Sequence, residues 1–187
     1  MRYILLLLML VSININAQSF RLNSSGFVNS EDNTKDYVVL DFPNQSQSEL
    51  FSKAMIFVTK YYKSAKDVIS KVDNETISIN AISSHDIPRN SIHYYQNRYI
   101  IVLSFKDGKI KVDAPNVSLT RYTDGQLRTL YIYREKGDIL EYNLGIFGKN
   151  EKLRYPKSKE ALESFANRFL DDLKKNILGD SSTNDDW

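Results

Sequence analysis

The chain has 187 residues, of which 42% are hydrophobic and 26% are charged, a composition typical of one globular domain. With 25 Lys and Arg against 23 Asp and Glu, the formal net charge is only +2, which excludes a general electrostatic attraction to nucleic acid or anionic lipid. The sequence contains no cysteine, so disulfides, thiol chemistry and half of the usual zinc ligands are excluded as well.

The first 17 residues have the pattern of a secretory signal peptide. Arg2 gives a short basic start, residues 3–13 form an almost unbroken apolar run, and the small residue Ala17 precedes Gln18. The run has about half of the roughly 20 residues that a membrane-spanning helix needs, which favours cleavage over a retained anchor. We therefore expect cleavage between Ala17 and Gln18, export to the periplasm, cell surface or medium, and no transmembrane segment afterwards.

The next elements follow in chain order. Residues 18–35 are rich in Ser, Asn and acidic residues, with isolated apolar side chains, and we interpret them as a loosely held leader. Residues 36–42 are β-prone and end at Pro43, which predicts a strand. Ser46 and Glu49 have the spacing of a capping box, so a helix is predicted over residues 47–62.

A run of antiparallel strands is predicted next. Residues 68–72 and 77–81 form one hairpin, residues 83–97 a long polar loop, and residues 98–105 and 109–117 a second hairpin around Asp107 and Gly108. Residues 126–134 alternate between two faces and predict a further strand. Gly137 and Asp138 indicate a turn, residues 139–144 a returning strand, and residues 145–156 a loop.

The last predicted element is a helix that begins with Ser158 as its cap and ends at Gly179. Its apolar stripe requires a partner surface, since an isolated helix is marginal in water. Residues 180–187 form a short acidic tail. The sequence thus predicts a single α+β domain over residues 36–179, in which two helices pack on one face of a curved antiparallel sheet.

Several short segments together resemble the domain of unknown function 4468 family. These segments are Asp41-Phe42-Pro43, Gln45-Ser46-Gln47-Ser48-Glu49-Leu50-Phe51, Ser64-Ala65-Lys66-Asp67-Val68-Ile69 and Lys106-Asp107-Gly108-Lys109. The resemblance covers about residues 36–119. It implies a TBP-like fold and an exported protein of a Bacteroidetes-type bacterium, but no activity, because none is established for the family. The name of the fold does not imply DNA binding.

The sequence departs from the family pattern in three places. Met55-Ile56-Phe57 stands where many members have a Trp, and Glu75-Thr76 stands where a turn Gly is usual. Residues 126–144 resemble an added hairpin. These departures concern the register of the strands more than the fold.

Residues with catalytic or metal-binding chemistry are few. His85, Asp86 and His93 lie in one polar loop, but a metal site needs three or four converging ligands, so neither a metal nor a cofactor is expected. Ser84, His85 and Asp86 are adjacent, whereas members of a hydrolase triad are normally distant in sequence. Carboxylates at or near predicted strand ends leave open a small envelope hydrolase as the alternative; they are Asp36, Asp41, Glu135, Asp138 and Glu141.

Twelve tyrosines are the most distinctive part of the composition. Tyr131 and Tyr133 are two residues apart and therefore share one face of a predicted strand, while Leu130 and Ile132 share the other. The aliphatic face is the better candidate for burial, which leaves the tyrosines to contact a protein or carbohydrate partner. We therefore expect a non-catalytic binding or assembly module of the bacterial cell envelope.

Overall fold

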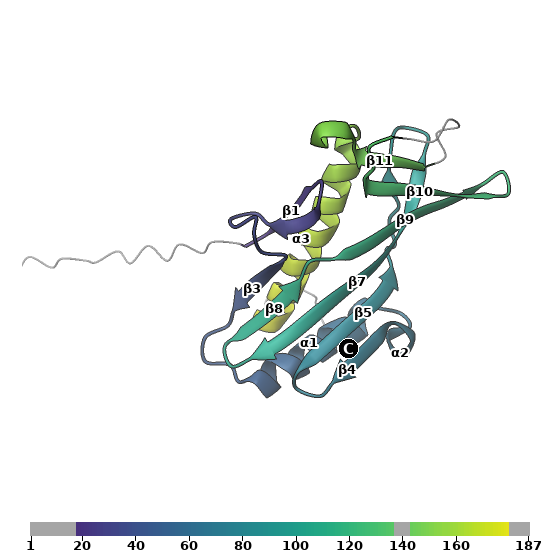
Figure 1. Cartoon of the computed structure of the whole chain (residues 1–187). Coiled ribbons are helices and arrows are strands. Elements are labelled where there is room, and N and C mark those ends of the chain that lie inside the picture. The colour runs from purple at the N-terminus through teal and green to yellow at the C-terminus, as the bar shows by residue number, and fades with distance from the viewer. Residues whose placement is uncertain (1–17, 137–142, 180–187) are drawn as a thin grey trace, which may run out of the picture.

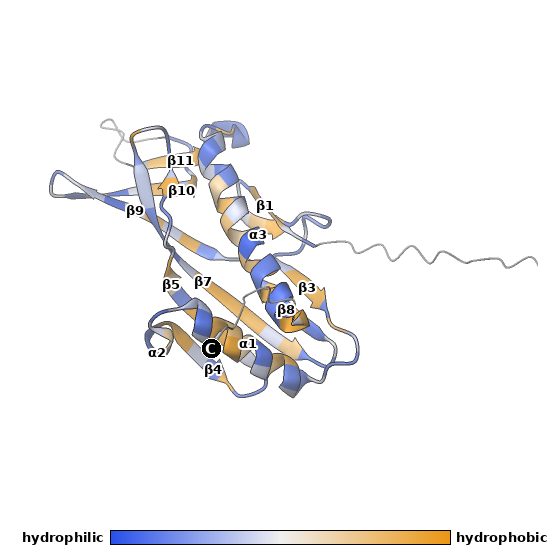
Figure 2. Cartoon of the chain, turned by 180° about the vertical axis from the view of Figure 1, so that it is seen from behind, coloured by the Kyte–Doolittle hydropathy of each residue, from blue (hydrophilic) through white to orange (hydrophobic). Residues whose placement is uncertain are grey.

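The computed structural model describes residues 18–136 and 143–179, and its fold is α+β, with a mostly antiparallel sheet covered on one face by helices (Figures 1 and 2). The predicted signal peptide, the turn at Gly137 and Asp138, and the acidic tail lie outside the described residues. In chain order, the elements are β1 (Phe20–Asn23), β2 (Gly26–Asn29), β3 (Tyr37–Asp41), α1 (Gln47–Tyr61), α2 (Ala65–Val68), β4 (Ile69–Val72), β5 (Thr76–Ile82), β6 (Ile87–Pro88), β7 (Tyr94–Lys106), β8 (Lys109–Asp113), β9 (Asn116–Thr123), β10 (Gln126–Tyr133), β11 (Asn143–Phe147), η1 (Lys149–Glu151) and α3 (Pro156–Leu178).

The long strand β7 organises the sheet. On one side it pairs with β5, which pairs with β4. On the other side its C-terminal part pairs with β8 and its N-terminal part with β9. Ala114 and Pro115 separate these two strands, because proline has no N–H to donate to a ladder. The single strand predicted over residues 109–117 is therefore wrong. The sheet divides at this point, because β8 pairs with β3 on its far side and β9 pairs with β10.

Helix α1 begins as the sequence predicts. Glu49 N–H donates to Ser46 Oγ over 3.3 Å, and Ser46 N–H donates to Glu49 Oε2 over 2.8 Å, which completes the capping box. The helix buries the apolar face that its spacing predicts, apart from Tyr61, which is 43% exposed at the C-terminal end.

Helix α3 docks on the same face of the sheet as α1 (Figure 2). Its buried stripe is Leu162, Ala166, Phe169, Leu170, Leu173 and Ile177. Gly179 ends the helix with a left-handed φ of 78°, as predicted. Ser158 does not cap the helix, which starts at Pro156; its buried hydroxyl instead donates to the carbonyl oxygen of Pro88 over 2.7 Å and fastens the helix to β6.

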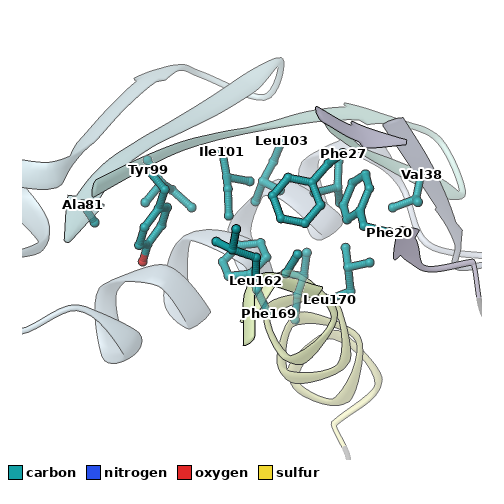
Figure 3. Packing of buried hydrophobic residues seen from close by; sticks show 14 of the residues in the cluster. Phe20, Phe27, Val38, Ala81, Tyr99, Ile101, Leu103, Leu162, Phe169 and Leu170 are labelled. Carbon is teal, nitrogen blue, oxygen red and sulfur yellow. The ribbon is translucent and has the colours of Figure 1, made fainter. Parts of the chain in front are cut away.

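The segment predicted as a loose leader is an ordered β-hairpin. Strands β1 and β2 pair, and Phe20, Leu22 and Phe27 are buried in the main core, where Figure 3 shows both phenylalanines between the sheet and α3. Asn167 of α3 binds the backbone of Phe20 through both atoms of its amide, over 2.7 and 3.0 Å. The prediction of a loose leader over residues 18–35 is therefore wrong, because apolar side chains at alternate positions supply a buried face even in a polar segment.

The predicted polar loop over residues 83–97 is also partly strand. Strand β6 pairs with β7, which begins at Tyr94 rather than at residue 98. Tyr95, Asn97 and Tyr99 point inward at a period of two and are buried. Because Gln96, Asn97 and Arg98 are polar, this part of β7 did not show the apolar alternation typical of a strand.

Strand β10 pairs with β9 through a two-residue turn, in which Asp124 and Gly125 have left-handed φ values of 52° and 74°. The antiparallel return predicted over residues 139–144 is wrong where the structure describes it, since β11 begins at Asn143 and runs parallel to β10. Gly145, predicted as loop, lies within β11 opposite Tyr131. A Cβ atom there would overlap the Arg134 backbone nitrogen and the Phe147 carbonyl oxygen, so only glycine fits.

Candidate functional site

Two of the predicted carboxylates, Asp36 and Asp41, are not brought together by the fold. Asp36 precedes β3 and Asp41 ends it, so about five residues at roughly 3.3 Å each separate their Cα atoms by about 16 Å. Glycoside hydrolases place their two carboxyl groups about 5–10 Å apart. Asp41 instead forms an ion pair with Lys109 over 3.6 Å, and Glu135 follows β10. Asp138 and Glu141 lie outside the described residues.

The two histidines occupy different surroundings. Nδ1 of His85 lies 2.9 Å from Ser84 Oγ, while Asp86 has no hydrogen bond to either side chain within the described chain, so the three adjacent residues do not form the relay of a triad. His93 Nδ1 accepts from Arg89 Nη2 over 2.9 Å, and burial together with the Arg89 charge lowers the pKa of His93. Across residues 18–136 and 143–179, no three His, Asp or Glu side chains converge on a metal position.

Tyr131 and Tyr133 lie on the face of the sheet opposite the helices. They are 40% and 45% exposed, whereas Leu130 between them is 2% exposed and belongs to the core. Tyr122 and Leu127, 73% and 63% exposed, form a directly opposed pair on β9 and β10. Leu127, Tyr131 and Tyr133 share one face of β10, on which Thr129 lies between Leu127 and Tyr131. The four exposed residues Tyr122, Leu127, Tyr131 and Tyr133 are named here the tyrosine strip.

The tip of the β9–β10 hairpin, next to the Tyr122–Leu127 pair, projects from the body of the molecule (Figure 1), whereas Tyr131 and Tyr133 lie where β10 pairs with β11. The guanidinium carbon of Arg134 lies 5.1 Å from the centre of the Tyr131 ring, a cation–π contact. The strip is therefore a ridge with a cation at its base, rather than a cavity.

A second surface is concave and was not predicted from the sequence. A cleft of about 660 Å³ opens where the end of α1, the segment 82–87 after β5, and α3 meet. Its aromatic side chains are Tyr61, Tyr62, Tyr99 and Phe165, and its polar side chains are Lys63, Ser83, Ser84, His85, Asp86, Ser164 and Arg168. We name it the aromatic cleft.

The aromatic rings of the cleft are held in place by one another. The ring centres of Tyr99 and Phe165 lie 4.7 Å apart, and those of Tyr61 and Tyr62 lie 5.0 Å apart. The hydroxyls of Tyr62 and Tyr99 are hydrogen bonded over 2.9 Å, which joins the end of α1 to β7. Burial raises the pKa of both hydroxyls, so both remain protonated at neutral pH.

Sequence patterns gave only part of this cleft. Tyr99 lies on the inward face of a predicted strand, and Tyr61 lies on the apolar face of a predicted helix. The polar segment with His85 and Asp86 was recognised, but only as a loop. These segments and α3 meet only in the folded structure, so local sequence patterns cannot predict the cleft.

Comparison with known proteins supports the family resemblance and shows the fold. Residues 37–120 match the family described as "Domain of unknown function (DUF4468) with TBP-like fold", which confirms the resemblance. A TBP-like protein from Parabacteroides distasonis ATCC 8503 superposes with a TM-score of 0.55 at 14% identity, over 76% of this chain and 90% of that one. A DUF4468 family protein from Bacteroides ovatus ATCC 8483 gives 0.53 at 16% identity, over 75% and 84%. No curated protein matches the sequence.

Proposed function

We propose that this chain is a non-catalytic binding module of the bacterial cell envelope. Residues 37–120 match the DUF4468 domain with a TBP-like fold, and the description of that family names no reaction. The observation that carries the proposal is the tyrosine strip. Large apolar side chains gathered on a projecting surface are typical of contact sites, and Tyr is enriched in such sites because it combines a large ring with a polar tip.

The shape of the strip favours a protein partner. A ridge formed by Tyr122, Leu127, Tyr131 and Tyr133 cannot enclose a small ligand, but it can enter an apolar groove on another protein. Arg134, stacked on Tyr131, places a positive charge beside the ridge, which favours a groove with an acidic rim.

The envelope location is part of the proposal and rests on the signal-peptide pattern of residues 1–17. No helix within the described residues is long and apolar enough to cross a bilayer. Intact-mass measurement of the protein recovered from the periplasm or medium of its native host is expected to show Gln18 as the first residue. A stable species that retains Met1 contradicts the proposed export.

The proposed contact is tested by the double variant Tyr131→Ser/Tyr133→Ser. Because both side chains are partly exposed and lie outside the core, the free energy of unfolding is expected to fall by no more than about 1 kcal/mol. Capture of the envelope partner by the tagged mature protein is expected to fall strongly.

The matched control is Ile56→Ala, which removes an exposed apolar side chain from α1, 56% exposed and outside the strip. This variant is expected to retain both stability and capture. Clear destabilisation by the double variant contradicts the exposed role of the tyrosines. Unchanged capture by a stable double variant contradicts the proposed contact.

A further inference from the structure

The aromatic cleft lies apart from the tyrosine strip and is formed by different elements, α1, α3, β7 and residues 82–87. We propose that it is a second binding site, which takes an acidic pyranose, a sugar ring that carries a carboxylate. The proposal is independent of the partner contact at the strip, because none of the strip residues lines the cleft.

The aromatic side chains that line the cleft supply the apolar contact that a sugar ring requires. Tyr61 is 43% exposed, and Tyr62 and Phe165 are partly exposed, so ring surface is available at the mouth and along the wall. One face of a pyranose presents C–H groups, while hydroxyls surround its edge. A shallow cleft with aromatic walls and a polar rim matches both parts, whereas a purely apolar ligand would leave the rim unpaired.

The hydroxyl pair at the base of the cleft has one hydrogen to donate. Tyr62 and Tyr99 carry two phenolic hydrogens, and the bond between their oxygens uses one of them. Burial raises the pKa of both groups, so the other hydrogen is retained at neutral pH. No acceptor for it is present among the described residues, and both tyrosines line the cleft.

The charges of the rim select an acidic ligand. Among the lining residues Lys63 and Arg168 outnumber the carboxylate of Asp86, while Asp172 near Tyr61 lies outside the lining. None of Lys63, Asp86 and Arg168 belongs to an ion pair within the described chain. The guanidinium of Arg168 can bind a carboxylate through two parallel hydrogen bonds. Asp86, Ser84 and Ser164 then remain as partners for sugar hydroxyls.

The test is a titration of the mature protein, ¹⁵N-labelled and followed by NMR. D-glucuronate is expected to give saturable shifts at Tyr62, Tyr99 and Phe165, with a dissociation constant of about 1 mM, as for a small ligand with few contacts. Methyl β-D-glucoside, which has no carboxylate, is expected to bind at least tenfold more weakly. Cyclohexanecarboxylate, which has no hydroxyls, is expected to give no saturable shifts there.

Variants locate the site. Arg168→Gln is expected to weaken glucuronate binding about tenfold, and Tyr62→Phe several-fold, while Arg134→Gln beside the tyrosine strip leaves it unchanged. Spectra without ligand show whether each variant keeps its fold. Absence of saturable shifts with glucuronate in the wild-type protein overturns the proposal. Equal binding of methyl glucoside overturns the acidic class, and equal binding of cyclohexanecarboxylate overturns the saccharide class.

Discussion

Asn97 is a polar residue at a position that the strand alternation of β7 places in the core. Its side chain is fully buried on the inward face of β7 between Tyr95 and Tyr99, and neither amide atom has a hydrogen-bond partner among the described residues. Leaving a buried polar group without a partner costs about 1–3 kcal/mol. The buried, unpaired amide of Asn97 is therefore expected to lower the free energy of unfolding.

Asn97→Val is expected to raise the free energy of unfolding by about 1–3 kcal/mol, because it removes the unpaired amide and suits a strand. Urea denaturation measures the change. Gln96→Val, on the exposed face of the same strand, serves as control and is expected to change stability by no more than about 0.5 kcal/mol. A loss of stability in Asn97→Val would show that the amide contributes a favourable interaction in the folded state.

Single residues also show where sequence reasoning was sufficient. Ser46 and Glu49 form their predicted capping box, and Gly179 ends α3 as predicted, because both features depend on neighbours within a few residues. The exposure of Tyr131 and burial of Leu130 follow from the alternation of one strand. The partner role of Tyr131 and Tyr133 remains a proposal.

At the scale of elements, prediction failed where a strand depends on a distant partner. The β1–β2 hairpin is ordered by contacts with α3, more than 140 positions away in sequence. Strand β11 is parallel to β10, and Gly145 within it and Gly148 just after it made residues 145–156 resemble a loop. Local propensity carries no information on such pairings, since strand preference reflects packing against neighbours.

Gly145→Ala tests the parallel pairing. An added Cβ would overlap the backbone of Arg134 and Phe147, so β11 has to shift, and the free energy of unfolding is expected to fall by about 1–3 kcal/mol. Thermal unfolding measures the effect. Ser118→Ala, an exposed change on β9, is the control. If Gly145→Ala is as stable as this control, β11 does not lie against β10 as described.

At the scale of the whole molecule, the α+β class and the two helices on one face of the sheet were predicted from the order of elements, and the family resemblance from the order of several short segments. The aromatic cleft was not, because Tyr62, Tyr99 and Phe165 meet only through the packing of α1, β7 and α3. The molecule therefore presents two surfaces of different shape, a projecting ridge and a concave cleft. We propose a protein partner for the ridge and an acidic sugar for the cleft.

The central claim is that a partner contacts the tyrosine strip. Site-specific photocrosslinking in the native host tests it most directly, with a benzophenone amino acid placed at position 133, at position 127, or at position 56 on the exposed face of α1. We expect one adduct of constant mass at positions 133 and 127, competed by excess wild-type protein but not by the Tyr131→Ser/Tyr133→Ser variant, and no such adduct at position 56. Absence of the adduct at both strip positions, or the same adduct at position 56, would contradict the claim.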